Sequence, residues 1–600
     1  MVIDKNLVKD GIRAVPRGVN SGTDPATLSR EYVAFAVNTS CRGGYIKTRP
    51  GYKKLEIDYG GNESLQDGLF QGASTFKGRE QETCIVALIS GVLFRYDLGG
   101  SPNTVSNIAS QVLIGGNPVF DNNSAQERQA WMLDAEGFLI VQNGLERPLI
   151  YDGVSTRRAG DGEIRVGCMM EYSNGRIWVV RPDRTSFAAG DIVYGPSGTV
   201  AYNFRDAILK TTENEFLNEG GDFTIPMNAG RINAIRNISI LDTSMGQGPL
   251  QVLTDRATFS VNAPADRTIW KDLTYPIQTV SLIGNGALSQ DGTVSINGDI
   301  WYRAKDGIRS LVIGLRSFNE LGNVPMSREM NRVIEADDKR LLGYDSAIVF
   351  ENRQLRTCSP ANSFLHGTYH RGLIALDFDI ASSMAGRQAP AYDGLWTGVR
   401  ILKLLGGNFG GVDRAFAFVL SASDKIELWE ITANDLFDNM SRRIESFIET
   451  PALFDGLNMR ELFGGEIWID ELSGRTDFDL KWRPDQYAGW FDWHSWSECA
   501  NYQSCTLTNC EPIPNLQKQY RSKMRLPKPP EGCSVEDNRP ANKAFLFQLR
   551  LAWTGSNRIR GVAAHTWTID EEPYGECRLE SPCISSNVCP TPVFSYSAET

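Results

Sequence analysis

The feature that most constrains this chain is a long succession of short apolar runs, each followed by Gly, Asn or Asp turn residues. Three examples are residues 83–100 (TCIVALISGVLFRYDLGG), 137–155 (GFLIVQNGLERPLIYDGVS) and 293–314 (TVSINGDIWYRAKDGIRSLVIG). In each example two apolar runs flank a tight turn, which is the pattern of an antiparallel hairpin. Successive hairpins without amphipathic helices between them predict a degenerate β-propeller over residues 61–445.

The composition shifts after residue 445, and the pattern there predicts a second β domain over residues 446–600. In residues 545–553 every second side chain is apolar and those between are both polar and apolar, which is typical of a sheet with one solvent-exposed face. Four strands are expected in this region, at residues 464–474, 478–486, 544–555 and 558–570.

The predicted fold class is therefore all-β, with a degenerate β-propeller followed by a small C-terminal β-sandwich-like domain. We expect residues 1–60 to form an N-terminal arm and a first strand. The C-terminal domain carries a long, irregular, Cys-rich insertion at residues 484–543, and the chain ends in an extended tail.

Two segments are expected to be helical. Residues 29–38 (SREYVAFAVN) have Ser29 as a candidate N-cap. Residues 327–343 (SREMNRVIEADDKRLLG) place apolar side chains near helical spacing and end at Gly343. The second helix suits either a subunit-packing element or a crossover that covers a sheet edge.

Charge and hydropathy limit the classes of partner. Of the 600 residues, 61 are Lys or Arg and 72 are Asp or Glu, which gives a net charge of −11. Such a chain is poorly suited to wrapping nucleic acid by neutralising phosphates. The N-terminus lacks the basic and apolar regions of a secretory signal, and the apolar stretch 85–94 is too short to span a bilayer. We therefore expect no membrane segment.

Eleven cysteines are unevenly distributed, and seven of them fall in the last 102 residues. None forms the CxxC pair of common structural zinc sites. With an odd count and no export signal, free thiols are favoured over disulfides and over a metal site. The seven C-terminal residues are Cys499, Cys505, Cys510, Cys533, Cys577, Cys583 and Cys589.

Motifs of catalysis are scarce. The chain has four histidines and contains no GxSxG, HExxH, P-loop or dinucleotide-binding sequence. His366 and His370 have the spacing of helical metal ligands but lie in strand-like sequence. The carboxylate pairs Asp377/Asp379 and Asp470/Glu471 could serve a glycosidase, but solvated strand faces explain them better. We predict no enzymatic activity and no catalytic, cofactor-binding or metal-binding residues.

Two further groups of residues remain candidates for contacts. Trp490, Trp493 and Trp496 could stack on sugar rings or anchor a packed loop. A basic loop in KQYRSKMRLPKPP could contact a phosphate group, but a solvated loop or a dock for an acidic partner surface is the favoured interpretation. The candidate partner-contact residues of this loop are Lys518, Arg521, Lys523, Arg525 and Lys528.

Several stretches resemble one family of structural proteins. Residues 38–55 (NTSCRGGYIKTRPGYKKL) resemble the opening of tail nozzle or tail-hub proteins of short-tailed bacteriophages, the tail tubular protein B and packaged-DNA-stabilisation family. Residues 230–261 and 279–314 resemble its propeller hairpins, and 464–485 with 545–570 resemble its C-terminal β domain. The resemblance rests on the order of these segments and on their general sequence pattern, since no single motif is diagnostic.

The resemblance implies a virion protein, assembled in the host cytoplasm and located in the tail. It implies a homo-hexameric ring that contacts the portal or adaptor ring and tail fibres or spikes. Genomic DNA would be retained and then conducted through the lumen without sequence-specific binding. Acidic residues are expected to line that lumen, because a polyanion slides past like charge. The alternatives from the residues are a propeller glycosidase and a glycan-binding, receptor-binding module.

Overall fold

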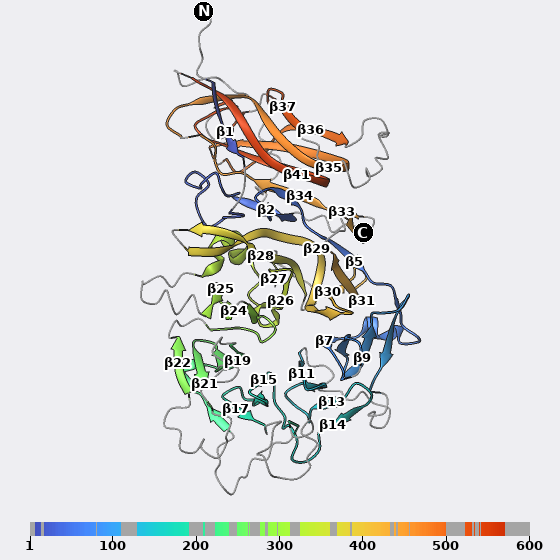
Figure 1. Cartoon of the computed structure of the whole chain (residues 1–600). Coiled ribbons are helices and arrows are strands. Elements are labelled where there is room, and N and C mark those ends of the chain that lie inside the picture. Colours follow the sequence, from blue (N-terminus) through green and yellow to red (C-terminus); the bar gives the residue numbers. More distant parts are fainter. Residues whose placement is uncertain are drawn as a thin grey trace, which may run out of the picture.

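The chain folds into a β-propeller with a long-stranded C-terminal β sheet stacked against one side of it (Figure 1). This computed structural model describes residues 7–13, 17–79, 81–109, 129–190, 208–209, 222–238, 249–261, 263, 277–281, 286–296, 298–311, 325–359, 369–384, 387–432, 437–439, 442–454, 456–485, 487–499, 522–530, 533–534, 539–540 and 542–569. The predicted all-β class and the degenerate propeller are confirmed.

Five separate sheets form most of the propeller, and all but one of their strand pairs are antiparallel. The first has the order β6 (Ile57–Asp58), β10 (Asn103–Asn107), β9 (Val92–Asp97), β8 (Cys84–Ile89) and β7 (Phe70–Phe76). The second contains β11 (Trp131–Ala135), β12 (Phe138–Gln142), β13 (Leu149–Tyr151) and β14 (Thr156–Arg158). The third contains β15 (Met170–Ser173), β16 (Arg176–Val180), β17 (Ser186–Ala189) and β18 (Asp222–Thr224). The fourth contains β19 (Ile232–Asn237), β20 (Leu250–Thr254), β21 (Thr258–Val261) and β22 (Ile277–Ser281), and the fifth β23 (Val294–Ile296), β24 (Asp299–Ala304) and β25 (Gly307–Ser310).

One long strand supplies the last two blades. β29 (Arg387–Phe409) pairs first with β28 and then, from Arg400 onward, with β30. The sixth blade is β26 (Ala347–Phe350), β27 (Arg353–Cys358), β28 (His370–Met384) and the first part of β29. The seventh is the second part of β29, β30 (Val412–Leu420), β31 (Ile426–Thr432) and β5 (Gly51–Lys54). An N-terminal strand thus completes the last blade, next to the first.

The N-terminal segment connects the propeller to the C-terminal sheet. β2 (Phe35–Val37) lies between β34 (Glu445–Glu449) and β29, and β1 (Leu7–Ile12) pairs with β41 (Phe547–Thr568). β3 (Thr39–Ser40) pairs with β4 (Ile46–Thr48), which also contacts β41. The helix expected at residues 29–38 is therefore wrong. Phe35, Ala36 and Val37 are all buried, so their backbone groups need hydrogen-bond partners. As a strand, this segment can pair with both β34 and β29, which a helix cannot do.

The C-terminal sheet is built on two long strands, β35 (Arg460–Pro484) and β41. Each replaces a pair of shorter strands expected from the sequence. The pairing continues through register shifts between Asp470 and Asp477, where the strands bend without reversing. Gly555 permits one bend, since its φ is +117° and a Cβ there would lie 2.6 Å from the carbonyl oxygen of Arg475.

Part of the predicted irregular insertion is regular. β36 (Phe491–Cys499) pairs with the end of β35, and β37 (Ser522–Leu526) pairs with its first half. β40 (Lys543–Ala544) adds a short pairing to β35. A small two-stranded ladder forms within the insertion, between β38 (Cys533–Ser534) and β39 (Arg539–Pro540). Another lies before the C-terminal sheet, between β32 (Phe437–Asp438) and β33 (Arg442–Arg443). Aromatic side chains favour the first addition, because Trp493 is buried in the C-terminal core and Phe491 and Trp496 pack against it.

The helix expected at 327–343 is shorter than predicted. A 3-10 turn at Met326–Met330 leads into α3 (Asn331–Ala336), and a second turn follows at Leu342–Tyr344. Asp337 ends α3 because its carboxylate accepts hydrogen bonds from Arg303 and from the backbone N–H of Ser359. Two further 3-10 turns lie at Glu63–Asp67 and Met227–Ala229. Across the described ranges, no helix is long and apolar enough to span a membrane.

Glu329, in the turn before α3, makes the stability of the fold depend on pH. Burial raises the pKa of its carboxyl from 4.5 to about 7, and Arg17 offsets this only in part. The folded state therefore holds the proton more tightly, so this contribution to stability is complete below about pH 4.5 and is lost as pH rises through about 7. We expect Glu329→Gln to stabilise the protein by about 1–2 kcal/mol more at pH 8 than at pH 5.

Thermal unfolding at both pH values checks this expectation. Glu335→Gln, at an exposed position on α3, is the matched control and should leave the pH dependence unchanged. Equal effects of Glu329→Gln at pH 5 and pH 8 would contradict the role assigned to Glu329.

Candidate functional site: a basic groove on the C-terminal sheet

The structure places part of the predicted basic loop on a strand. Lys523 and Arg525 belong to β37, both are exposed, and Lys528 follows the strand. Lys518 and Arg521 lie outside the described residues. Because β37 pairs with β35, Lys523 is in register with Trp468, and Arg525 with Glu466. Residues paired in this way project to the same face of the sheet.

That face is hollow and basic. The sheet order is β1, β41, β35 and β37, and its opposite face is core, with Ile12, Ile467 and Val562 buried. Small residues of β41, Gly561 and Ala563, stand opposite Trp468 and Glu466. They leave a groove of about 590 Å³. Its lining residues are Lys9, Arg13, Glu466, Trp468, Ile469, Lys523 and Arg560.

Gly561 is required where the strands approach each other. A Cβ at this position would lie 2.5 Å from the carbonyl oxygen of Ile12 and 2.9 Å from the Trp468 ring. The Trp468 ring therefore lies low over β41 and forms part of the groove floor. The Arg13 guanidinium lies 5.9 Å and the Lys523 ammonium 5.3 Å from the centre of that ring.

Two buried carboxylates organise the cations of the groove. The Glu466 carboxylate forms an ion pair with Lys523, with 2.8 Å between Nζ and Oε2, and a longer one with Lys9 at 3.7 Å. Burial alone would raise the pKa of Glu466, but Lys523 and Lys9 outweigh it and hold the pKa below its ordinary value. Asp470 binds Arg560 at 2.7 Å. Burial and the nearby Lys9 lower the pKa of His565, although Glu466 opposes the shift, which favours the neutral form of this histidine. Four cations against two carboxylates leave the groove positive on an acidic chain.

Sequence reasoning identified Lys523 but missed Lys9, Arg13 and Arg560. Lys9 and Arg13 lie about 500 positions from residues 518–528, and Arg560 lies 32 positions after them, so strand pairing brings all three to the groove. One signal was present, since Glu466, Trp468 and Asp470 alternate with the apolar Ile467 and Ile469. That alternation predicts a wet face carrying both charge and an aromatic ring.

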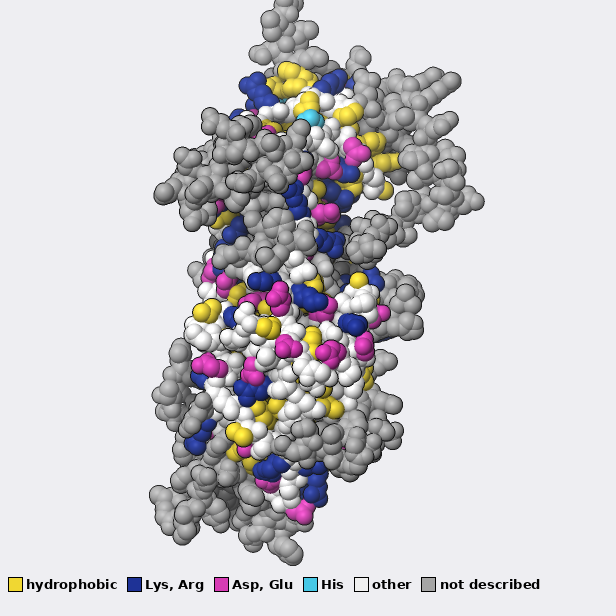
Figure 2. Space-filling view, turned by 90° about the vertical axis from the view of Figure 1, so that its right-hand side faces the viewer, with side chains coloured by type: hydrophobic (Ala, Val, Ile, Leu, Met, Phe, Trp, Pro, Cys, Tyr) yellow, Lys and Arg dark blue, Asp and Glu magenta, His cyan; other side chains and the backbone are white. Residues whose placement is uncertain are grey.

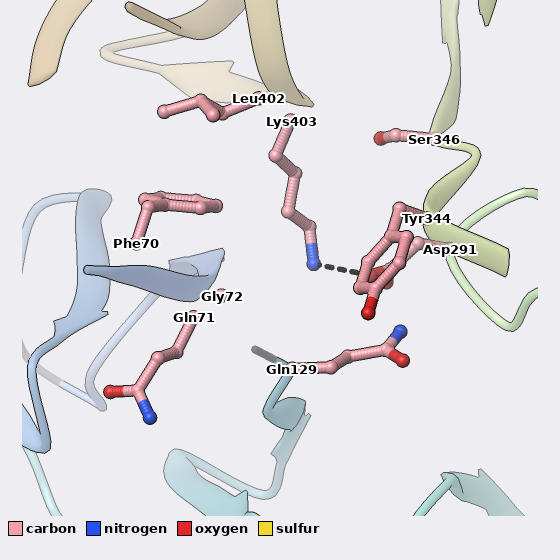
Figure 3. A pocket seen from close by; sticks show the side chains of 9 residues that line it. All are labelled: Phe70, Gln71, Gly72, Gln129, Asp291, Tyr344, Ser346, Leu402 and Lys403. Atoms are coloured by element: carbon pink, nitrogen blue, oxygen red, sulfur yellow. Dashed lines mark hydrogen bonds and ion pairs between the residues drawn. The ribbon is translucent and has the colours of Figure 1, made fainter. Parts of the chain in front are cut away.

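A second polar site lies at the centre of the propeller, lined by residues of β7 and β29 and by residues that precede β11, β23 and β26 (Figure 3). Lys403 on β29 reaches across it to Asp291, with 2.8 Å between Nζ and Oδ2. The cavity volume is about 30 Å³, enough for one or two water molecules. This ion pair joins residues of different blades, which suits a structural role.

We expect Lys403→Met to lower the free energy of unfolding by about 1 kcal/mol, because the pair is only partly screened by solvent. Urea unfolding at low salt measures the loss, and high salt should reduce the difference from the wild type. Asp291→Asn, which keeps a hydrogen-bonding side chain, should cost less. A loss of several kcal/mol would contradict the modest role assigned to this pair.

The other candidate acids and histidines are held in ion pairs or buried. Asp377 is fully buried between Arg42 and Arg353, and Asp379 also binds Arg42. Burial raises the pKa of the neighbouring Asp393 to about 6, although Arg353 opposes the shift. Asp470 and Glu471 bind Arg560 and Arg558. His370 is buried against the carbonyl of Tyr344, and His366 lies outside the described residues.

The three tryptophans follow the packed-anchor interpretation. The guanidinium groups of Arg483 and Arg550 each lie 4.5 Å from the centre of the Trp490 ring. Trp493 is buried and donates from Nε1 to the carbonyl oxygen of Pro527. Trp496 stacks on Phe478 with 5.1 Å between ring centres. These contacts hold β36 against the C-terminal core.

Cys41, Cys84, Cys168 and Cys358 are free and buried. Within the described ranges, no three His, Cys, Asp or Glu side chains group closely enough to hold a metal ion.

Comparison with known proteins shows only remote structural likeness. No family model and no curated protein matches the sequence. The chain is similar to BBS1N in complex with ARL6DN, with 8% identity, 64% of this chain and 99% of that chain covered, and a TM-score of 0.33. It is also similar to Trypanosoma rangeli sialidase in complex with the inhibitor DANA, with 9% identity, 89% and 95% coverage, and a TM-score of 0.25. At such TM-scores these likenesses carry no information about function.

Proposed function

We propose that this chain is a structural subunit of the ring-shaped tail nozzle of a short-tailed bacteriophage. In this role it forms the end of the tail tube, below the portal and adaptor ring, and carries tail fibres or spikes. It retains the genomic DNA and then conducts it during ejection. The support is the resemblance of the opening, the propeller hairpins and the C-terminal strands to that family, in the same order along the chain.

The observation that carries the proposal is the position of residues 38–55, which open the resemblance. Their strands β4 and β5 pair with β41 and β31, so this short segment contacts both the C-terminal sheet and the propeller. Arg49, within the RPG turn, is fully buried at their junction. Strand pairing of one segment with both parts suits the wall of a tube that retains DNA.

The charge of the chain agrees with a conduit for DNA. Six copies at −11 each would present a strongly acidic assembly, along which a polyanion slides without binding. On the face visible in Figure 2, acidic and basic side chains are interspersed over the propeller. The proposal therefore places the acidic lining on another face of the subunit, and a strongly basic lumen would contradict it.

Single-particle electron microscopy of the purified chain, with its mass measured alongside, tests the proposal. The subunit has a mass of 66.5 kDa, so a sixfold ring with an axial channel should reach roughly 400 kDa. Because tail subunits can require a preceding ring, a monomer is next mixed with a portal–adaptor complex. Failure to form a ring under both conditions would overturn the proposal.

The alternatives from the sequence make different predictions. A propeller glycosidase would hydrolyse a polysaccharide. A receptor-binding module would bind glycans without hydrolysing them and would not assemble into a ring of subunits. The carboxylate pairs first considered for hydrolysis are bound by arginines, which favours the structural role. Polysaccharide cleavage by the purified chain would favour the glycosidase.

A further inference from the structure

We propose that the basic groove binds an acidic saccharide, a sugar ring that carries a carboxylate or a phosphate group. The inference concerns Lys9, Arg13, Trp468, Lys523 and Arg560, and it holds whether or not the chain assembles into a ring. It rests on the shape of the groove, its aromatic floor and its mixed charges.

The shape indicates a small ligand. At about 590 Å³ the groove lies within the ordinary range of small-molecule sites, which is roughly 300–1,000 Å³. Its hollow is built into the backbone, because Gly561 admits no side chain without a clash with Ile12. A protein partner would instead need a broad surface of about 800 Å² on each side.

The floor indicates a ring. Trp468 is half-buried, lines the groove and keeps part of its indole accessible. An indole presents a large apolar face at little entropic cost, and the apolar face of a pyranose ring can lie on it. Arg13 and Lys523 stay 5.9 Å and 5.3 Å from the centre of the indole, so both can meet an acid group on such a ring.

The mixture of cations and carboxylates in the groove favours an acidic saccharide over other anions. Sugar hydroxyls require acceptors as well as donors, and the groove supplies both, with Glu466 and Asp470 beside the four cations. A nucleic-acid backbone or an acidic peptide would meet these two carboxylates as like charges. The remaining positive charge still favours a ligand with one or a few acid groups. Within the described residues Arg13 has no carboxylate partner, which leaves its guanidinium available for that group.

Isothermal titration calorimetry of the full chain tests the proposal with defined probes. We expect trigalacturonic acid to bind with a Kd between micromolar and millimolar. Maltotriose, the neutral probe, should bind at least about tenfold more weakly. Glucose 6-phosphate distinguishes a phosphate from a carboxylate as the acid group. Inorganic phosphate and a hexaglutamate peptide test for an anion without a sugar ring, and a thymidine decamer tests for a nucleic-acid backbone.

Variants locate the binding. Arg13→Gln and Lys523→Gln should each weaken trigalacturonate binding about five- to tenfold, and Trp468→Ala more strongly. Lys305→Gln removes one exposed cation on the propeller and should leave the affinity unchanged. Circular dichroism checks that Trp468→Ala is folded, and the two Gln variants decide the question if it is not. Tighter binding of the decamer or the peptide, unchanged affinity in Arg13→Gln, or no binding of either acidic sugar would overturn the proposal.

Discussion

Replacing Arg49 by glutamine should lower the free energy of unfolding by about 3–5 kcal/mol, the usual cost of removing one partner of a buried ion pair. Arg49 is completely buried and makes two charge-assisted bonds to Asp438, at 2.8 and 3.0 Å. It also donates to the side-chain oxygen of Asn38 and to the carbonyl oxygen of Thr397. The variant would leave the carboxylate of Asp438 buried without its cation. Urea unfolding followed by circular dichroism measures the loss.

The control for this variant is Lys54→Gln, which also breaks an ion pair of the N-terminal segment. Lys54 binds Glu427 at 2.6 Å, but its side chain is 42% exposed, so the expected loss is below about 1 kcal/mol. If Arg49→Gln were no more destabilising than Lys54→Gln, the junction between the propeller and the C-terminal sheet would not depend on Arg49.

Replacing Trp482 by alanine should cost about 3–5 kcal/mol, because it opens a large cavity in the C-terminal core. Trp482 lies on β35, is 1% exposed, and contacts Phe491 and Trp493 of β36. The loss should loosen β36 from the long sheet. Differential scanning calorimetry measures the change in stability, and limited proteolysis reports cleavage in the segment that follows β36.

Trp490→Ala is the matched control on the same hairpin. This ring is only half-buried and contacts Arg483 and Arg550, so its removal should cost about 1–2 kcal/mol. An equal loss for both tryptophans would contradict the larger role assigned to the core contacts of Trp482, because β36 would then depend equally on the contacts of Trp490 with Arg483 and Arg550.

Much of the fold follows from local patterns in the sequence. The hairpins at 83–100 and 293–314 were predictable because apolar alternation and turn residues agree with each other. The length of β35 was not predictable, since Gly474 signals a turn by local rules while the partner strand β41 keeps the ladder continuous. The helix predicted at residues 29–38 was wrong for a similar reason, because pairing with β34 and β29 decides the conformation of Phe35–Val37.

The candidate site was predictable only in part. The basic character of Lys523 and Arg525 is visible in the sequence, but the groove depends on Gly561 and Arg13, which reach β35 through β41 and β1. Strand pairs this far apart in the sequence leave no local trace. The ion pair between Lys403 and Asp291 was missed for the same reason, since it joins residues of different blades that are 112 positions apart in the sequence.

The pairing of β1 with β41 has a consequence for the synthesis of the protein. Leu7 finds its partner at Trp567, so the first strand emerges from the ribosome long before the strand that it must join. At about 5–20 residues per second the wait is roughly 30–110 s. The last blade has a similar delay, because β5 must wait for β31. A nascent chain that stops before residue 547 would therefore expose unpaired strand edges at its N-terminus, and truncated products should aggregate or be degraded rather than accumulate as folded fragments.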